Sequence, residues 1–275
     1  VLFDGTTNIA GSVTATSFIG DGSQLTNLPP NSPFSPNTTS GTGIQSPTNT
    51  ATGTFSVAMG DSTTASGISS TAMGSGTQAS GVVSTAMGRI TIASGNFATA
   101  MGDFTIASDY NSLVVGRYNL LGSTVTNSAT QFSTDNTAFV IGNGADSDNR
   151  SDALTVLFDG TTTIAGDLSI NSDARLKANI ISLGSTLAKL LLIDGKTYTM
   201  KKDENKKQKI GVLAQDIEKV FPELVSESNG VKSVNYQGLV PVLINALKEQ
   251  QAEIERLKTQ EERLDKLERL VAAMD

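Results

Sequence analysis

Ser172 and Lys177 lie five residues apart in the stretch INSDARLKAN, and their types and spacing are suited to nucleophilic chemistry. A serine hydroxyl needs a base to become a nucleophile, and this chain has no histidine. A lysine can act as that base if burial or a nearby positive charge, such as Arg175, lowers its pKa from about 10.4. Taken alone, such a pair is ordinarily part of a solvated loop, so the surrounding elements must decide its role.

Other groups that could do chemistry are sparse. No glutamate occurs before Glu204, and we find no carboxylate pair of the kind that glycosidases use. Residues 146–152 contain three aspartates, but their spacing is not that of an EF-hand, and a solvated turn is the preferred interpretation over a calcium site. We therefore predict no cofactor, no metal and no activity on external substrates.

Charge and composition change near Ser172. Residues 1–172 hold three basic residues (Arg89, Arg117 and Arg150) against eleven aspartates, whereas residues 173–275 hold seventeen basic and sixteen acidic residues. Good helix formers are concentrated in the second part. No basic patch suggests nucleic acid, and no run reaches the roughly 18 apolar residues of a membrane span. The two parts are therefore expected to have different architectures.

A repeat with a period of 14 residues fills the middle of the first part. Each unit reads as two short strands, each followed by a turn at glycine. Two strands and two turns make one coil of a β-solenoid, and we expect the small alanines to face another chain. The repeated triplets are Ala-Met-Gly at 58–60, 72–74, 86–88 and 100–102, Val-Val-Gly at 114–116, and Ala-Ser-Gly at 65–67, 79–81 and 93–95.

Further β segments flank these repeats. VLFDGTT occurs at Val1 and again at Val156, each time as a strand, an Asp-Gly turn and a strand. Residues 14–30 resemble a short shaft element, and residues 29–48 hold five of the seven prolines in a connector. Residues 117–171 are predicted to add β structure, with 136–142 as the clearest strand. Because no initiator methionine precedes Val1, we expect the chain to be part of a longer protein.

Helices are predicted after Lys177. Residues 211–221 have helical apolar spacing that ends at Pro222. A last helix runs from about Tyr236 to Met274, and its near-heptad spacing favours a coiled coil of parallel chains over a single amphipathic helix. The spaced apolar residues are Leu243, Leu247, Ile254, Leu257, Leu264 and Val271.

Two parts of the chain resemble known families. Residues 55–116 resemble the β-roll repeats of trimeric bacterial adhesin heads and of some phage tail fibres, which carry a similar small–apolar–Ala–apolar–Gly signature. Residues 172–275 resemble the C-terminal intramolecular chaperone, a self-cleaving peptidase domain, of phage endosialidases and tail fibres. The matching stretches are SDARLK (172–177), GVLAQDIEKVFPELV (211–225) and VNYQGLVPVLINALKEQQAEI (234–254), with Tyr198 between the first two.

These resemblances imply a mainly β fibrous homotrimer followed by an α+β chaperone domain that ends in a long coiled-coil helix. Residues 1–54 would form a β shaft segment with a proline-rich connector, and residues 55–116 the β-roll repeats. Residues 117–171 would form a further β shaft, and residues 172–275 the chaperone.

The chaperone resemblance also implies a chemistry. Such a domain brings three chains into register, guides their folding and then releases itself in a single turnover, with Ser172 and Lys177 as a serine–lysine dyad. The family precedent places the cut between Ser172 and Asp173. An acyl shift onto Ser172 would instead break the bond after Asn171.

The whole pattern predicts the distal part of a phage tail fibre, assembled in the host cytoplasm and carried on the virion. Its expected partners are two further copies of itself and a glycan or protein on the host surface, with turn tips at 61–64 and 89–91 as candidate contact points. Two alternatives stay open: a bacterial trimeric surface adhesin, and a polysaccharide-degrading tailspike whose enzymatic domain lies outside this chain.

Overall fold

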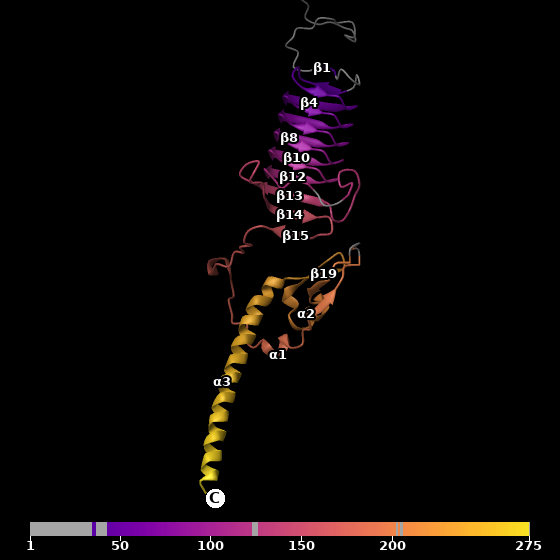
Figure 1. Cartoon of the computed structure of the whole chain (residues 1–275). Helices are drawn as coiled ribbons and strands as arrows, with labels where there is room; N and C mark the ends of the chain where they lie inside the picture. The colour runs from indigo at the N-terminus through magenta and orange to yellow at the C-terminus, as the bar shows by residue number, and fades with distance from the viewer. Residues whose placement is uncertain (1–34, 37–42, 123–125, 202, 204–205, 275) are drawn as a thin grey trace, which may run out of the picture. The chain divides into compact units, whose positions relative to one another are not determined.

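A computed structural model describes residues 35–36, 43–122, 126–201, 203 and 206–274 of the chain. The first copy of VLFDGTT and the shaft element at 14–30 therefore lie outside the described residues. Internal contacts divide the chain into two units, Val1–Ala165 and Gly166–Asp275. In Figure 1 the strands of the first unit run from indigo to pink and the helices of the second are orange and yellow.

The first unit is a β-solenoid, which confirms the interpretation of the 14-residue period. One sheet contains β1 (Ser35–Pro36), β2 (Gly43–Gln45), β4 (Ser56–Asp61), β6 (Thr71–Ser75), β8 (Thr85–Arg89), β10 (Thr99–Asp103) and β12 (Leu113–Arg117). The other contains β3 (Thr50–Ala51), β5 (Thr64–Ala65), β7 (Gln78–Ala79), β9 (Ile92–Ala93) and β11 (Ile106–Ala107). From β2 to β12, each strand pairs in parallel with a strand one coil away, so that Met73, for example, lies beside Met87, whereas β1 pairs antiparallel with β2.

The alanines line the inside of the solenoid, so the expectation that they face another chain is wrong. Ala58, Ala72 and Ala86 are fully buried within their own chain, whereas the neighbouring methionines, such as Met73, point outward and are only half-buried. The reason is space, because two sheets that face each other across one narrow coil leave room only for small inward side chains. The larger apolar side chains therefore form the outer face.

Serine and threonine share the interior with alanine. A buried hydroxyl recurs about every seven residues, and several have no hydrogen-bond partner among the described residues. Such a group loses its hydrogen bonds to water without replacement, which costs free energy. The residues are Thr63, Ser70, Thr77, Ser84, Thr91 and Thr105.

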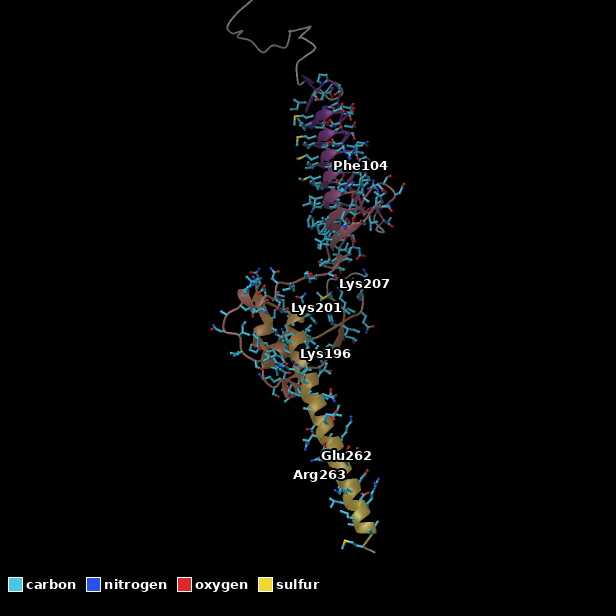
Figure 2. The ribbon with its side chains drawn as sticks, turned by 90° about the vertical axis from the view of Figure 1, so that its left-hand side faces the viewer. Phe104, Lys196, Lys201, Lys207, Glu262 and Arg263 are labelled. Carbon is cyan, nitrogen blue, oxygen red and sulfur yellow. The ribbon has the colours of Figure 1, made fainter. Side chains whose placement is uncertain are left out.

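The corners of each coil depend on backbone in the left-handed region. At Gly88, φ is +122° and an added Cβ would lie 2.0 Å from the carbonyl oxygen of Gly102, so only glycine fits. A second corner position takes larger residues with positive φ, among them Ile90 (φ 50°) and Phe104 (φ 56°). Phe104 projects at such a corner in Figure 2 and stacks on Tyr118 with ring centroids 4.6 Å apart.

The solenoid ends where the repeat is broken. β13 (Thr137–Asn143) still pairs in parallel with β12, but β14 (Asp152–Leu157) and β15 (Thr162–Ile164) follow as antiparallel strands. Asp109 stands where earlier coils have a glycine, and its carboxylate accepts from the Thr137 backbone N–H at 2.8 Å. The strand predicted at 136–142 and the strand–turn–strand at Val156 are both confirmed.

The second unit has a small α+β core. Its short elements are the 3-10 turns η1 (Ala174–Leu176), η2 (Pro222–Leu224) and η3 (Tyr236–Gly238), the helix α1 (Leu187–Leu190), and two hairpins, β16 (Lys196–Tyr198) with β17 (Lys209–Gly211) and β18 (Val225–Ser228) with β19 (Val231–Val234). Helix α2 (Ala214–Val220) starts later than the predicted residue 211, because Lys209–Gly211 is strand and Leu213 is extended. Ile217 and Phe221 pack against Val242 to form the core.

Helix α3 (Leu239–Ala272) confirms the predicted C-terminal helix. Its first turns supply the buried residues Val242 and Ala246, whereas every residue from 250 to 274 is exposed. Figure 2 shows the side chains of this distal half, including Glu262 and Arg263, along the outside of the helix. The exposed half still carries leucines at near-heptad spacing, so its apolar face has no partner within the described part of the chain.

Candidate functional site

The chain around Ser172 is shaped by a single 3-10 turn. Asp173 begins the turn: its carboxylate accepts from the Arg175 backbone N–H at 2.9 Å, and its carbonyl accepts from the Leu176 N–H at 3.0 Å. The Lys177 N–H then donates to the Ala174 carbonyl at 3.1 Å. The cap satisfies an otherwise unpaired N–H at the start of the turn, which is the usual role of aspartate there.

This turn brings the two predicted catalytic residues together. The ammonium nitrogen Nζ of Lys177 donates to the hydroxyl Oγ of Ser172 at 2.7 Å. A nucleophile and its base must lie within about 2.6–3.2 Å of each other, and this pair does. Both side chains are exposed, so within one chain the pair has contact but no burial.

Arg175 forms an ion pair with Asp173. Its guanidinium binds the Asp173 carboxylate, with Nη2 at 2.6 Å from Oδ2 and Nε at 3.1 Å from both oxygens. The Arg175 side chain holds the pKa of Asp173 below its usual value, and Asp173 raises the pKa of Arg175 in turn. The Arg175 guanidinium therefore supports the cap of the turn.

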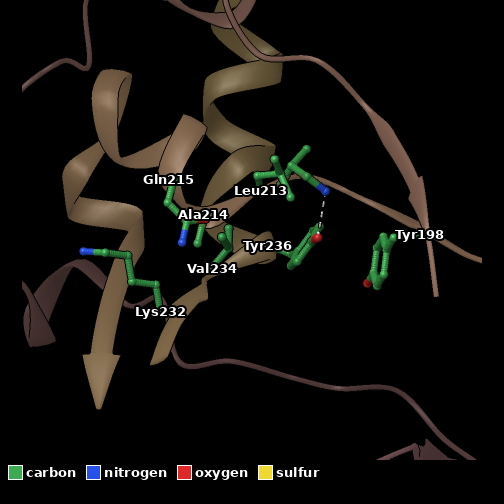
Figure 3. A pocket seen from close by; sticks show the side chains of 8 residues that line it. Tyr198, Leu213, Ala214, Gln215, Lys232, Val234 and Tyr236 are labelled. Carbon is green, nitrogen blue, oxygen red and sulfur yellow. Dashed lines mark hydrogen bonds between the residues drawn. The ribbon is translucent and has the colours of Figure 1, made fainter. Parts of the chain in front are cut away.

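A pocket in the same unit gathers residues from the distant motifs. It is lined by Tyr198 from β16, residues 212–215 before and within α2, and Lys232, Val234 and Tyr236 beyond it. Figure 3 shows Tyr236 with its hydroxyl accepting from the Val212 N–H at 3.1 Å. We call this the tyrosine pocket. These residues belong to separate stretches of the sequence, and their spacing gives no sign that they meet.

Gly211 lies beneath this pocket in close contact with both tyrosines. A Cβ at Gly211 would lie 2.6 Å from the Tyr236 hydroxyl oxygen and 3.2 Å from a ring carbon of Tyr198. Both rings therefore rest directly on the backbone at the end of β17. The close approach fixes the spacing between the two tyrosines.

Glu249 on α3 anchors the chain between the dyad and the core. Its carboxylate accepts from the Ser185 hydroxyl at 2.6 Å and from the backbone N–H groups of Thr186 and Leu187. These bonds lower the pKa of Glu249. Because the first N–H groups of α1 have no partner inside that helix, the carboxylate both caps α1 and attaches it to α3.

The remaining predicted sites gather no ligand sphere among the described residues. Asp146 accepts from the backbone N–H groups of Asp148 and Asn149, each at 2.9 Å, as in a solvated turn, and these bonds together with the Asn149 side chain lower its pKa. Within the described ranges, no group of three or more carboxylates is placed to hold a metal ion. At the turn tips, Asp61 is exposed, and Arg89 forms an ion pair with Asp103 at 2.8 Å.

Two protein families match parts of this chain. Residues 172–226 match the family described as chaperone of endosialidase. Five overlapping stretches between residues 47 and 119 match the YadA head domain repeat. The dyad, Tyr198 and residues 212–215 of the tyrosine pocket all lie inside the first match, and the solenoid coils lie in the second.

Similar curated proteins are long tail fiber proteins of phages. The chain is 34% identical over 104 residues to Gp37 of Salmonella phage S16, covering 34% of this chain and 14% of that protein. It is 34% identical over 116 residues to Gp37 of Enterobacteria phage M1, covering 37% of this chain and 46% of that protein. The chain thus spans less than half the length of these curated relatives.

The matches support the organisation predicted from the sequence, a phage tail fibre with a C-terminal chaperone domain. They also indicate a component of the virion tail. Among the helices that the structure describes, none is long and apolar enough to cross a membrane.

Proposed function

We propose that this chain forms a homotrimeric part of a phage tail fibre that attaches to the host surface. In this proposal, residues 172–275 guide trimerisation and folding, and Ser172 then detaches them with Lys177 as its base. The observation that carries the proposal is the 2.7 Å contact between Lys177 Nζ and Ser172 Oγ. Two residues five apart meet in this way because a capped turn lies between them.

The cut can follow two routes. In an acyl shift, Ser172 Oγ attacks the carbonyl carbon of Asn171 while Lys177 moves the hydroxyl proton to the Ser172 nitrogen. The peptide bond breaks, an ester forms, and water hydrolyses it to leave a carboxylate on Asn171. Attack on its own carbonyl would close a four-membered ring, so a cut between Ser172 and Asp173 needs a water that the dyad activates.

Burial is the condition that would start the reaction. A lysine takes up a proton only in its neutral form, and removal from water favours that form. In the single chain Lys177 is exposed, so we infer that assembly of the trimer supplies the burial. Cleavage would then wait for correct association.

Two apolar surfaces support a trimer. The outer face of the solenoid carries an in-register ladder of methionines on β4, β6, β8 and β10. The distal half of α3 carries exposed leucines, including Leu257 and Leu264. Exposed apolar surfaces of this extent mark protein interfaces, and parallel heptads in α3 suit three chains in register.

The test compares wild type with Ser172→Ala by denaturing electrophoresis, with and without boiling. Wild type should yield a chaperone fragment and a fibre fragment that migrates as a trimer unless boiled, whereas Ser172→Ala should stay full length. Ser172→Thr is the matched control, since it keeps a hydroxyl. A full-length band for the wild type, after folding to a trimer, would remove the self-cleavage proposal.

The mass of the released fragment identifies the bond. A fragment that begins at Ser172 supports the acyl shift, and one that begins at Asp173 supports the water route. Binding of the purified fibre to host cells, measured by sedimentation, tests the attachment role. A fibre that folds and trimerises but leaves cells unbound would contradict that role.

A further inference from the structure

Residues 166–183, which we call the arm, are not covered by the described residues of their own unit. Every residue of the arm is exposed, and it carries six large aliphatic side chains that are between 45% and 87% exposed. An apolar segment of this kind marks a surface that binds another protein. The six are Leu168, Ile170, Leu176, Ile180, Ile181 and Leu183.

The arm is attached to helix α3 through Gly184 and Thr186, which we call the root of the arm. Asn245 Nδ2 donates to the Gly184 carbonyl at 3.2 Å, and the Thr186 hydroxyl donates to the Val242 carbonyl at 2.9 Å. Gly184 has φ of +70°, a conformation that suits glycine, so the chain changes direction where the arm leaves the root. Gly184 lies twelve positions after Ser172, which gives Ser172 a reach of up to about 40 Å when the chain is extended.

The tyrosine pocket holds polar groups without partners. Neither the Tyr198 hydroxyl nor the Gln215 carboxamide makes a hydrogen bond to another described residue, and the two side chains line the pocket on either side of Tyr236 (Figure 3). The remaining walls are largely apolar, with Val212, Leu213 and Val234 among them. No residue of the arm lines the pocket in its own chain.

Charge on the pocket's Lys232 side complements the dyad segment. Lys232 binds both Glu218 and Glu227, at 2.7 and 2.9 Å, which leaves a net negative charge beside this wall. Before docking, residues 172–177 carry Arg175 and protonated Lys177 against Asp173, a net positive charge that acts on the approach of the segment. Opposite charges of this kind favour one orientation of docking.

We propose that the arm of one chain docks in the tyrosine pocket of a second copy, and that the dyad becomes active only there. This proposal rests on the proposed self-cleavage. It states which surface would bury Lys177 and supply a hydrogen-bond donor. In a bundle of α3 helices the axes lie about 8–10 Å apart, well within the reach of the arm.

Docking supplies the two things that the exposed dyad lacks. The apolar walls remove Lys177 from water, and one of the two free donors, the Tyr198 hydroxyl or the Gln215 N–H, donates to the carbonyl oxygen as negative charge develops on it. Neither donor is consumed, so the bonds made and broken are those of the dyad reaction. Loss of one such donor typically slows a reaction by about 100-fold or more.

A complementation experiment tests whether the pocket belongs to another chain. One full-length chain carries Tyr198→Phe with Gln215→Met, and a second, differently tagged chain carries Ser172→Ala. Alone, each should form an uncut or very slowly cut trimer. Co-expressed, the first chain should be cut, at about half of its copies under random mixing, because its arm meets the intact pocket of a Ser172→Ala neighbour.

The other outcomes contradict the inference. No cut in the mixture, with wild type cut in parallel, would show that the pocket and the dyad act within one chain. Normal cleavage of the Tyr198→Phe, Gln215→Met homotrimer would show that the pocket is not used. An uncut wild type would overturn the self-cleavage proposal as well. Gln208→Met, an exposed glutamine outside the pocket, is the matched control and should be cut normally.

A direct contact test does not depend on catalysis. The chain has no native cysteine, so Leu176→Cys in one tagged Ser172→Ala chain and Gln215→Cys in another give a defined pair. Oxidation of the mixed trimer should yield a disulfide dimer that contains both tags. Replacing Gln215→Cys with Gln208→Cys should abolish it, and equal yields from the two pairs would overturn the docking.

Discussion

Asp173 holds the 3-10 turn that places Lys177 next to Ser172. Its carboxylate caps the turn through the Arg175 N–H and binds the Arg175 guanidinium, and the turn then presents Lys177 to Ser172. Asp173 touches neither reacting atom in its side-chain contacts, so we regard it as a positioning residue.

Substitution of Asp173 should therefore slow the cut without preventing assembly. Asp173→Ala removes cap and ion pair and should reduce the rate severalfold. Asp173→Asn keeps a capping oxygen and should retain more of it. The rate is followed as fragment appearance after assembly, and Arg175→Ala separates the ion pair from the cap. Equal rates for wild type and Asp173→Ala would show that the turn does not need its cap.

The pairing of Ser172 with Lys177 could be proposed from the sequence through the family resemblance, but the tyrosine pocket could not. Ser172 and Lys177 stand in a short motif, so their contact depends on local geometry that five residues determine. The tyrosine pocket depends on β16, α2 and η3 folding onto one another, and nothing in the spacing of Tyr198, Gln215 and Tyr236 shows that they meet. The role of Asp173 could have been predicted from its residue type, because aspartate often caps the start of a helical turn.

Among the elements, the solenoid coils repeat one unfavourable feature, a buried hydroxyl without a partner. Thr77 is fully buried, and its side-chain hydroxyl has no hydrogen-bond partner among the described residues. Thr77→Val keeps the shape and removes the unsatisfied group, so the fibre part should gain about 1–2 kcal/mol. Thermal unfolding of the fibre measures this, with the outward-facing Thr64→Val as control. A loss of stability at Thr77→Val would mean that the hydroxyl has a role in the coil.

The period of the repeats predicted which strands pair, but it did not predict which side chains face the inside of the coil. Alternation separates Ala86 from Thr85 and Met87 onto two faces, and either face could in principle be buried. The width of one coil decides in favour of alanine, and that width is a property of two sheets together.

Because Glu249 attaches α1 to α3, the stability of the second unit should depend on pH in the acidic range. Glu249 has a pKa below its ordinary value of 4.5 because Ser185 and the start of α1 donate to its charged form. A lowered pKa contributes stability that is present above 4.5 and is lost as pH falls through the folded value. The thermal unfolding temperature of the wild type should therefore decrease as the pH is lowered below 4.5.

Glu249→Gln supplies the comparison. Glu249→Gln should lower the thermal unfolding temperature at neutral pH. It should also make that temperature depend less on pH in the acidic range, because this carboxylate no longer titrates. Glu253→Gln, one turn further along the exposed helix, is the control, because its pKa is lowered by Arg256 and not by the root of the arm. An unchanged acid profile in Glu249→Gln would contradict the role of the anchor.

At the scale of the whole molecule, association and cleavage should be lost together. Leu257 is exposed on the apolar face of α3, and Leu257→Asp would place a charge at the centre of a three-helix seam. We expect chains that fail to trimerise in light scattering and remain uncut on gels. Arg263→Glu, elsewhere on the same exposed half of α3, should change neither. Cleavage in strictly monomeric Leu257→Asp would separate the reaction from assembly.

The stacked backbone of the solenoid has a consequence for how such a chain can change length. Each coil between Gly67 and Gly95 meets its neighbours through the same pairs, alanine on alanine and glycine on glycine. A deletion or duplication of one 14-residue coil joins surfaces that already match, and it moves the two ends of the stack by about 4.8 Å while β13 to β15 stay intact. A seven-residue change would instead set a long strand against a short one. Length is thus a quantity that evolution can adjust in whole coils, with no redesign of either end.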